Sequence, residues 1–228
     1  MIEFIKDKEI KKEYKVYGSF YNVYKYSKKL LECRNALEIV KKDCALNFSN
    51  KLYMHVPDAL VIMMNQGGSK PINYAPQQIQ LESLCRNILK VNLVLADPDK
   101  AQFQIMRLMN YKGWKNVRVI NLSDIRDGDS NSFFKKVKSF EDKYFSDIHS
   151  IFSKQRICEK QLAFSVGNDA PIILAWGLDT RLMLLTSRYM KFIPSEKIKG
   201  IAAHLYSHAS PRKQEDKKKW LQNIISVL

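Results

Sequence analysis

Unbroken apolar runs, each followed by a polar turn, are the main pattern from residue 57 onward. Residues 59–64 form such a run between Pro57-Asp58 and Gly67-Gly68, which is typical of a strand buried on both faces. Similar runs occupy residues 117–122, 170–177 and 201–206. The segments between the runs are long enough to cross over a sheet, as parallel strands require. We therefore expect the α/β class, with three layers (α/β/α) around a central, mainly parallel four-stranded sheet.

Amphipathic segments with helix-start and helix-stop residues fill the intervals. Apolar residues recur at near-helical spacing over residues 76–90, and a short strand is expected at 91–96. Asp97-Pro98 is expected to open the next helix with Asp97 as its N-cap, and Gly113 is expected to end it. Residues 133–164 and 213–228 are also expected to be helical.

The first fifty residues are rich in lysine and tyrosine. We expect them to be a helical extension packed on a core domain of residues 51–228. Between Tyr14 and Tyr26 the aromatic residues interleave with lysines, a pattern that can stack bases and contact phosphates. The favoured interpretation of this stretch is a helix that packs its aromatic face on the core.

The charge of the chain is strongly positive. Lys and Arg number 38 against 23 Asp and Glu, which gives a net charge of +15 and an isoelectric point near 9.6. Such a field attracts polyanions, of which nucleic acid is the commonest large one. Nucleic acid is therefore the expected partner, and a protein that is basic only for solubility is the alternative.

The cysteines and the N-terminus favour a cytoplasmic protein. Cys33, Cys44, Cys85 and Cys158 are far apart and form no Cys-x-x-Cys pair, so zinc and iron–sulfur sites are not indicated. The first residues lack the apolar region of a signal peptide, and no run approaches the ~18 apolar residues of a membrane span. We expect a cytoplasmic monomer with no metal and no cofactor.

Polar residues follow each predicted strand. These clusters are Asn65-Gln66-Gly67-Gly68-Ser69, Asn121-Leu122-Ser123-Asp124, Trp176-Gly177 and Ser207-His208-Ala209-Ser210-Pro211. In a parallel sheet all four endings lie on one edge, where open α/β sheets bind their ligands. The sequence therefore predicts a single site built from residues far apart in the chain.

The order of these motifs resembles the uracil-DNA glycosylase superfamily over roughly residues 55–228. Its first motif reads Gly-Gln-Asp-Pro-Tyr-His or Gly-Ile-Asn-Pro-Gly, and its last reads His-Pro-Ser-Pro. The chain is also similar to a bacterial family of unknown function with a Leu-Asn-Pro-Ser, Asp-Pro-Thr, Asn-Leu-Phe and Trp-Gly pattern, matched in order by Asp97-Pro98-Asp99, Asn121-Leu122-Ser123 and Trp176-Gly177. The chain departs from the superfamily at Gln66 and Ala209, where the motifs carry proline.

The resemblance implies a monofunctional DNA glycosylase that flips out a base and hydrolyses its N-glycosidic bond. It implies that Asn65 positions the water, with Asp97 as an alternative, and that His208 donates to the leaving base. Asn121 would read the base with its amide, beside Gln66 and Gly67. Because Gly67 replaces a tyrosine that walls off the pyrimidine C5 position, a damaged or bulky base is expected, such as a modified pyrimidine of phage DNA.

The same resemblance implies a set of residues that hold the phosphates of a kinked strand. This set is Ser69, Lys70, Ser207, Ser210, Arg212 and Lys213. Two other functions remain open. One is a catalytically inactive nucleic-acid-binding module on the same scaffold, which the loss of both prolines favours. The other is an enzyme that acts on free nucleotides, for which the positive charge is excessive.

Overall fold

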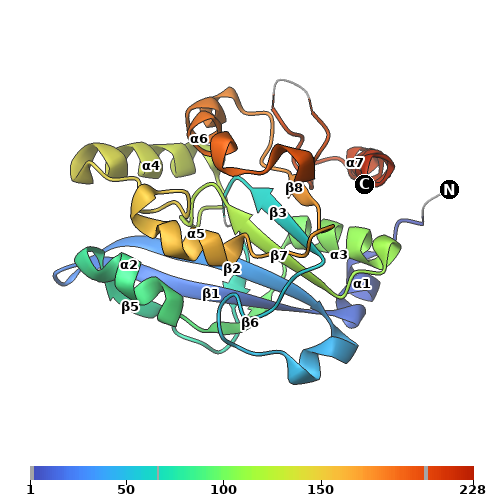
Figure 1. Ribbon diagram of the computed structural model, residues 1–228, viewed down its shortest axis with the longest axis horizontal. Helices are drawn as coiled ribbons and strands as arrows, with labels where there is room; N and C mark the ends of the chain where they lie inside the picture. The colour runs from blue at the N-terminus through green and yellow to red at the C-terminus, as the bar shows by residue number, and fades with distance from the viewer. Residues whose placement is uncertain (1–2, 66, 203–204) are drawn as a thin grey trace.

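The computed structural model describes residues 3–65, 67–202 and 205–228, and shows a mixed α/β protein (Figure 1). Within these residues nine strands form one large mixed sheet in the order β4-β6-β1-β2-β7-β3-β8-β9, with β5 paired to β1. The expectation of an α/β protein is met. The expected four-stranded, mainly parallel sheet is wrong, because antiparallel strands from the first half of the chain widen it.

The widening comes from a long hairpin of β1 (Tyr14–Lys25) and β2 (Lys28–Lys41), which was expected to be helical. Only α1 (Asp7–Glu13) and a short 3-10 turn at Lys42–Asn47 are helical in the described N-terminal part. Tyrosine, valine and phenylalanine dominate β1, and such residues favour strands because they pack well on a pleated surface. The lysine and tyrosine interleaving therefore reflects a strand and not a helix face.

Four parallel strands continue the sheet from β2. These are β7 (Asn116–Asn121), β3 (Ala59–Met63), β8 (Ile172–Leu174) and β9 (Ile198–Lys199). The first three match the predicted apolar runs. The fourth lies before the predicted segment 201–206, of which residues 203–204 are outside the described part of the chain. β2 joins this group by pairing antiparallel to β7.

The remaining strands lie beyond β1. β6 (Leu93–Asp97) pairs with β1 near its start, and β5 (Gln77–Gln80) pairs with it nearer the hairpin turn. β4 (Lys70–Pro71) lies at the edge against β6. The predicted helix at 76–90 is wrong at its start, where β5 lies. The rest of the segment is helical, with α2 (Leu84–Asn87) between 3-10 turns at Leu81–Ser83 and Ile88–Lys90.

Helices cover both faces of the sheet. α1, α3 (Lys100–Lys112) and α7 (Gln214–Val227) pack with one core cluster. α2, α4 (Ser130–Tyr144), α5 (Ile157–Ala163) and α6 (Met183–Tyr189) pack with the other. In β3, residues 60 and 62 face the second cluster while residues 59, 61 and 63 face the first. None of the described helices is long and apolar enough to cross a membrane.

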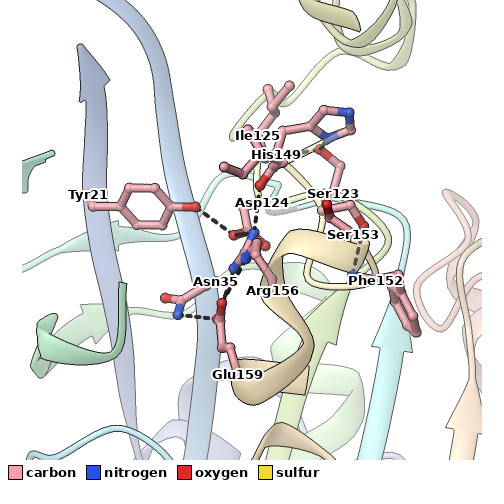
Figure 2. Close-up of polar contacts among 12 residues, drawn as sticks. Tyr21, Asn35, Ser123, Asp124, Ile125, His149, Phe152, Ser153, Arg156 and Glu159 are labelled. Carbon is pink, nitrogen blue, oxygen red and sulfur yellow. Dashed lines mark hydrogen bonds and ion pairs between the residues drawn. The ribbon is translucent and has the colours of Figure 1, made fainter. Parts of the chain in front are cut away.

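A buried charged network joins the hairpin to the second helical layer (Figure 2). Arg156 lies 2.7 Å from Asp124 and 2.7 Å from Glu159, and all three side chains are at most 1% exposed. The Tyr21 hydroxyl donates to Asp124 and the Asn35 amide donates to Glu159. Burial raises the pKa of Asp124 to about 7, against the opposing effect of Arg156. This network holds the segment after β7 against β1 and β2.

Candidate active site

The carboxyl ends of β3, β7 and β8 lie together, as the sequence predicted for parallel strands. Met63 is the register partner of Asn121 at the ends of β3 and β7. Beyond these ends the Ser123 amide donates to the Met64 carbonyl, and the Ala175 amide donates to the Ile62 carbonyl. The loops that carry Asn65, Asn121 and Gly177 therefore start from one edge of the sheet.

Asn121 has an unusual environment at this edge. It is 1% exposed, and within the described residues neither its amide nitrogen nor its amide oxygen has a hydrogen-bond partner. A buried amide without partners costs free energy, so most buried amides are paired. An asparagine held in this state offers one donor and one acceptor to a bound molecule.

Asp99 is the N-cap of α3, a role that the sequence analysis gave to Asp97. Its Oδ1 atom accepts from the amides of Ala101 and Gln102, and the Gln102 side chain closes a capping box. Asp97 is the last residue of β6 and makes an exposed ion pair with Lys11. The cap fixes the Asp99 carboxylate through one oxygen, which leaves Oδ2 to face the loop after β3.

Gly67 meets this second oxygen. A Cβ atom built on Gly67 would lie 2.7 Å from Asp99 Oδ2, and the backbone at Gly67 is in the left-handed region with φ +50°. Glycine suits the position for both reasons. The space that a side chain at Gly67 would fill is thus taken by the Asp99 carboxylate. From the sequence, this space was expected to widen the pocket for the base.

His208 approaches the same edge from the C-terminal part of the chain. Its Cβ is 3.8 Å from the position that a Gly177 Cβ would occupy, and Gly177 bonds to Tyr206. The Ser210 amide donates to His208 Nδ1 at 3.1 Å, so Nδ1 is unprotonated and the neutral ring carries its proton on Nε2. Burial lowers the pKa of His208, while the nearby Asp99 carboxylate raises it.

Two arginines bring positive charge to the site. Arg34 on β2 is 2% exposed, and burial lowers its pKa to about 10, with Asp99 opposing that shift. Arg126, in the loop after β7, donates to the Ser69 carbonyl at 2.9 Å. Both guanidinium groups lie over the Phe20 ring, at 5.9 and 5.2 Å from its centroid. Arg126 therefore contacts the Gly67–Ser69 turn, and Arg34 lies close enough to Asp99 for the two charges to interact.

The other predicted residues have varied positions. The Asn65 amide nitrogen donates to the Asp127 carbonyl at 2.6 Å, so this side chain anchors the loop. Ser69 is 1% exposed and its hydroxyl has no partner within the described chain. Lys70, in β4, is exposed, and Gln66 lies outside the described residues.

The predicted phosphate-binding residues near the C-terminus lie before and at the start of α7. Lys213 is the N-cap residue of that helix without a side-chain cap bond, and Arg212 beside it is exposed. The Ser207 carbonyl accepts from the indole nitrogen of Trp220, which ties the loop to α7. The structure therefore brings Asn65, Gly67, Asn121 and His208 to one edge and leaves the basic pair exposed beyond it.

Sequence reasoning missed Asp99, Arg34 and Arg126. The signal for Asp99 was the spacing of Asp99 and Gln102, which is that of a capping box. Arg34 gave no comparable signal, because its place depends on the pairing of β2 with β7.

A second polar chain near the end of β7 is hydrogen-bonded within the protein. Ser123 Oγ is 2.9 Å from His149 Nδ1, and His149 Nε2 is 3.2 Å from Glu141. The order is that of a nucleophile, a base and a carboxylate. Ser123 and His149 are 0% and 1% exposed, and Ser123 Oγ also accepts from the Ile125 amide, so both side chains, unlike Asn121, have partners within the protein. We interpret this chain as part of the buried network in Figure 2.

The donors for a metal ion are scattered. In the described ranges no group of three or more His, Cys, Asp or Glu side chains has the arrangement that could hold a metal. The four cysteines are free thiols.

Comparison of the chain with models of known protein families, with curated proteins and with solved structures finds no match.

Proposed function

We propose that this protein is a monofunctional DNA glycosylase that hydrolyses the N-glycosidic bond of a damaged or modified base. The observation that carries the proposal is Asn121, a buried asparagine with both amide atoms unpaired in the described chain. It lies at the sheet edge from which the loops of Gly67 and Gly177 start, and these two glycines approach Asp99 and His208. An amide of this kind matches the donor and acceptor pattern on the edge of a flipped base. The net charge of +15 supports DNA as the partner.

The chemistry needs a water on one side of the sugar and a stabilised leaving base on the other. We assign the water to Asp99, because the helix cap fixes Oδ1 and leaves Oδ2 facing the Gly67 turn. A carboxylate accepts a proton from water far better than the amide of Asn65, whose nitrogen is already bonded to Asp127. Asn65 would then act by holding the loop.

His208 is assigned to the leaving base. With Nδ1 occupied by the Ser210 amide, Nε2–H is the donor that can bond to a base oxygen as negative charge develops there. Arg34 and Arg126 add positive charge that favours an anionic leaving group. No lysine is among the groups assigned here, so the proposal has no Schiff-base step.

One assay tests the proposal. The protein is incubated with DNA that carries uracil, alkylated bases or C5-glycosylated cytosine, and alkali-labile strand breaks are counted. Breaks at one of these bases that form at least about 10-fold more slowly in the Asp99→Asn and Asn121→Leu variants support it. Excision that persists in both variants contradicts the assigned site.

A catalytically inactive DNA-binding module is the second candidate. The observation in its favour is the hydrogen bond from the Asn65 amide to the Asp127 carbonyl. This bond gives a structural role to the residue that the resemblance assigned to the water. Binding of DNA without release of any of the tested bases would support this candidate.

A further inference from the structure

A groove lined by lysines lies between the hairpin turn and α4. Its volume is about 380 Å³, and its lining includes Lys28, Lys29, Lys135, Lys136, Lys143 and Tyr144. The turn of the hairpin and α4 lie at the same, left-hand side of the molecule in Figure 1. We call this surface the lysine groove, and none of its described lining residues is acidic.

Much of its positive charge is uncompensated. Lys29 pairs with Glu32 and Lys136 pairs with Asp127. Within the described chain, by contrast, Lys25, Lys28, Lys135 and Lys143 have no ion-pair partner. Lys25 and Lys143 lie over the Tyr144 ring, at 5.2 and 5.7 Å from its centroid. Lysines gathered at this density repel each other, and a polyanion would relieve the repulsion.

Two exposed aromatic residues adjoin the groove along the chain. Tyr26 in the hairpin turn is 83% exposed and Phe145, next to Tyr144, is 94% exposed. Both have left-handed backbone conformations, with φ +53° and +49°. A large ring at such a position destabilises the folded state in two ways, because its backbone is strained and its apolar surface remains in water. A nucleobase stacked on each ring would use the exposed surface.

The groove is linked to the candidate active site through the loop that carries Asp127. Asn65 bonds to the Asp127 carbonyl, and the Asp127 carboxylate lies 2.7 Å from Lys136 in the groove. β2 runs antiparallel to β7, and Cys33 bridges to Ile125 beyond the end of β7. The hairpin turn therefore projects past the same sheet edge that carries Asn121.

We infer that the lysine groove binds the backbone of single-stranded DNA next to the base in the site, with Tyr26 and Phe145 stacking on unpaired bases. Lysines that follow a backbone, with aromatic rings beside them, make up the general pattern of single-strand binding. A duplex keeps its bases stacked on each other, so the two rings would find no free base face there. The inference rests on the proposed function and extends it by naming the strand that the protein holds.

The test measures binding and not excision. A labelled oligothymidine and a labelled duplex of equal length are each titrated with the full chain. Binding is followed by fluorescence anisotropy over a series of salt concentrations. The double variant Lys135→Gln/Lys143→Gln is expected to reduce the slope of log affinity against log salt by about 1.4, because each neutralised phosphate of a single strand adds about 0.7 to that slope. Tyr26→Ala and Phe145→Ala are each expected to weaken binding about 5- to 150-fold with an unchanged slope.

Lys115→Gln/Tyr111→Ala is the matched control, since both residues are exposed and Lys115 adjoins the opposite end of the hairpin. Its affinity and slope should equal those of the unmodified protein. Groove variants that behave like this control, or a duplex bound as tightly as the single strand, would overturn the inference. Single-strand binding through the groove without excision would leave it standing and refute the glycosylase proposal.

Discussion

The side-chain position of Gly67 and the Oδ2 atom of Asp99 compete for one space, being only 2.7 Å apart. Gly67→Ala should therefore displace the carboxylate and strain a backbone at φ +50°. We expect excision to slow by about 100-fold, the cost of a catalytic group misplaced by about 1 Å. Gly68→Ala is the control, because no described atom lies within 4 Å of the Cβ it would add. Equal rates for the two variants would refute this use of Gly67.

Replacing the Asp99 carboxylate by an amide separates capping from catalysis. Asparagine caps helices as well as aspartate does, so Asp99→Asn should leave the free energy of unfolding and the DNA affinity unchanged. The excision rate should fall about 100- to 10,000-fold, as for loss of a general base. Asp97→Asn, at an exposed ion pair, should leave the rate unchanged. Single-turnover kinetics and urea unfolding of both variants provide the measurements.

Asn121→Leu tests whether the unpaired amide is kept for a ligand. Because neither amide atom has a partner in the described chain, the isosteric apolar residue should keep or raise the free energy of unfolding. The value of kcat/KM should fall by about 10- to 100-fold, through loss of two hydrogen bonds to the base. Asn35→Leu, which removes a hydrogen bond to Glu159, should instead cost about 1–3 kcal/mol of stability. A destabilised Asn121→Leu protein would indicate a structural role for this amide.

The pH dependence of excision should have an acid limb set by His208. Burial lowers the pKa of this residue below 6.5, so its neutral form is present at pH 6.5 and above. As the pH falls through the lowered pKa, the ring takes up a proton that Nδ1 cannot carry while it accepts from Ser210. Both the rate and the stability contribution of His208 should be lost in that range. His208→Gln should flatten the acid limb of the rate profile, and an unchanged limb would assign it to another group.

Breaking the network of Figure 2 should destabilise the fold. Arg156→Met leaves Asp124 and Glu159 buried without their cation, which should cost about 3–5 kcal/mol. Arg181→Met removes a more exposed pair with Asp179 and should leave the free energy of unfolding nearly unchanged. Urea denaturation of both variants compares them, and equal losses would contradict the structural role of Arg156.

The central strands and their common edge were predictable because strands buried on both faces give continuous apolar runs. This reasoning located Asn121 and placed Asn65 beside it. It failed at the helix start, where the choice of Asp97 over Asp99 moved a carboxylate from the site to the surface. It failed again for Arg34, whose approach to the site depends on β2 pairing with a strand far along the chain. Such pairing is a tertiary effect, and local residue patterns do not encode it.

The hairpin also governs how the chain must assemble. Its β2 strand is complete at Lys41, yet its neighbour β7 begins only at Asn116, and Glu38 meets its buried partner Arg118 across that pairing. A chain emerging from the ribosome would thus carry two open strand edges through much of its synthesis. Open edges recruit strands from other molecules, and distant pairings form slowly. Yield of native protein should therefore improve when the expression level is lowered, because fewer chains with open edges then meet. Residues 1–50 cannot be trimmed away as a dispensable extension, because β1 and β2 lie within them.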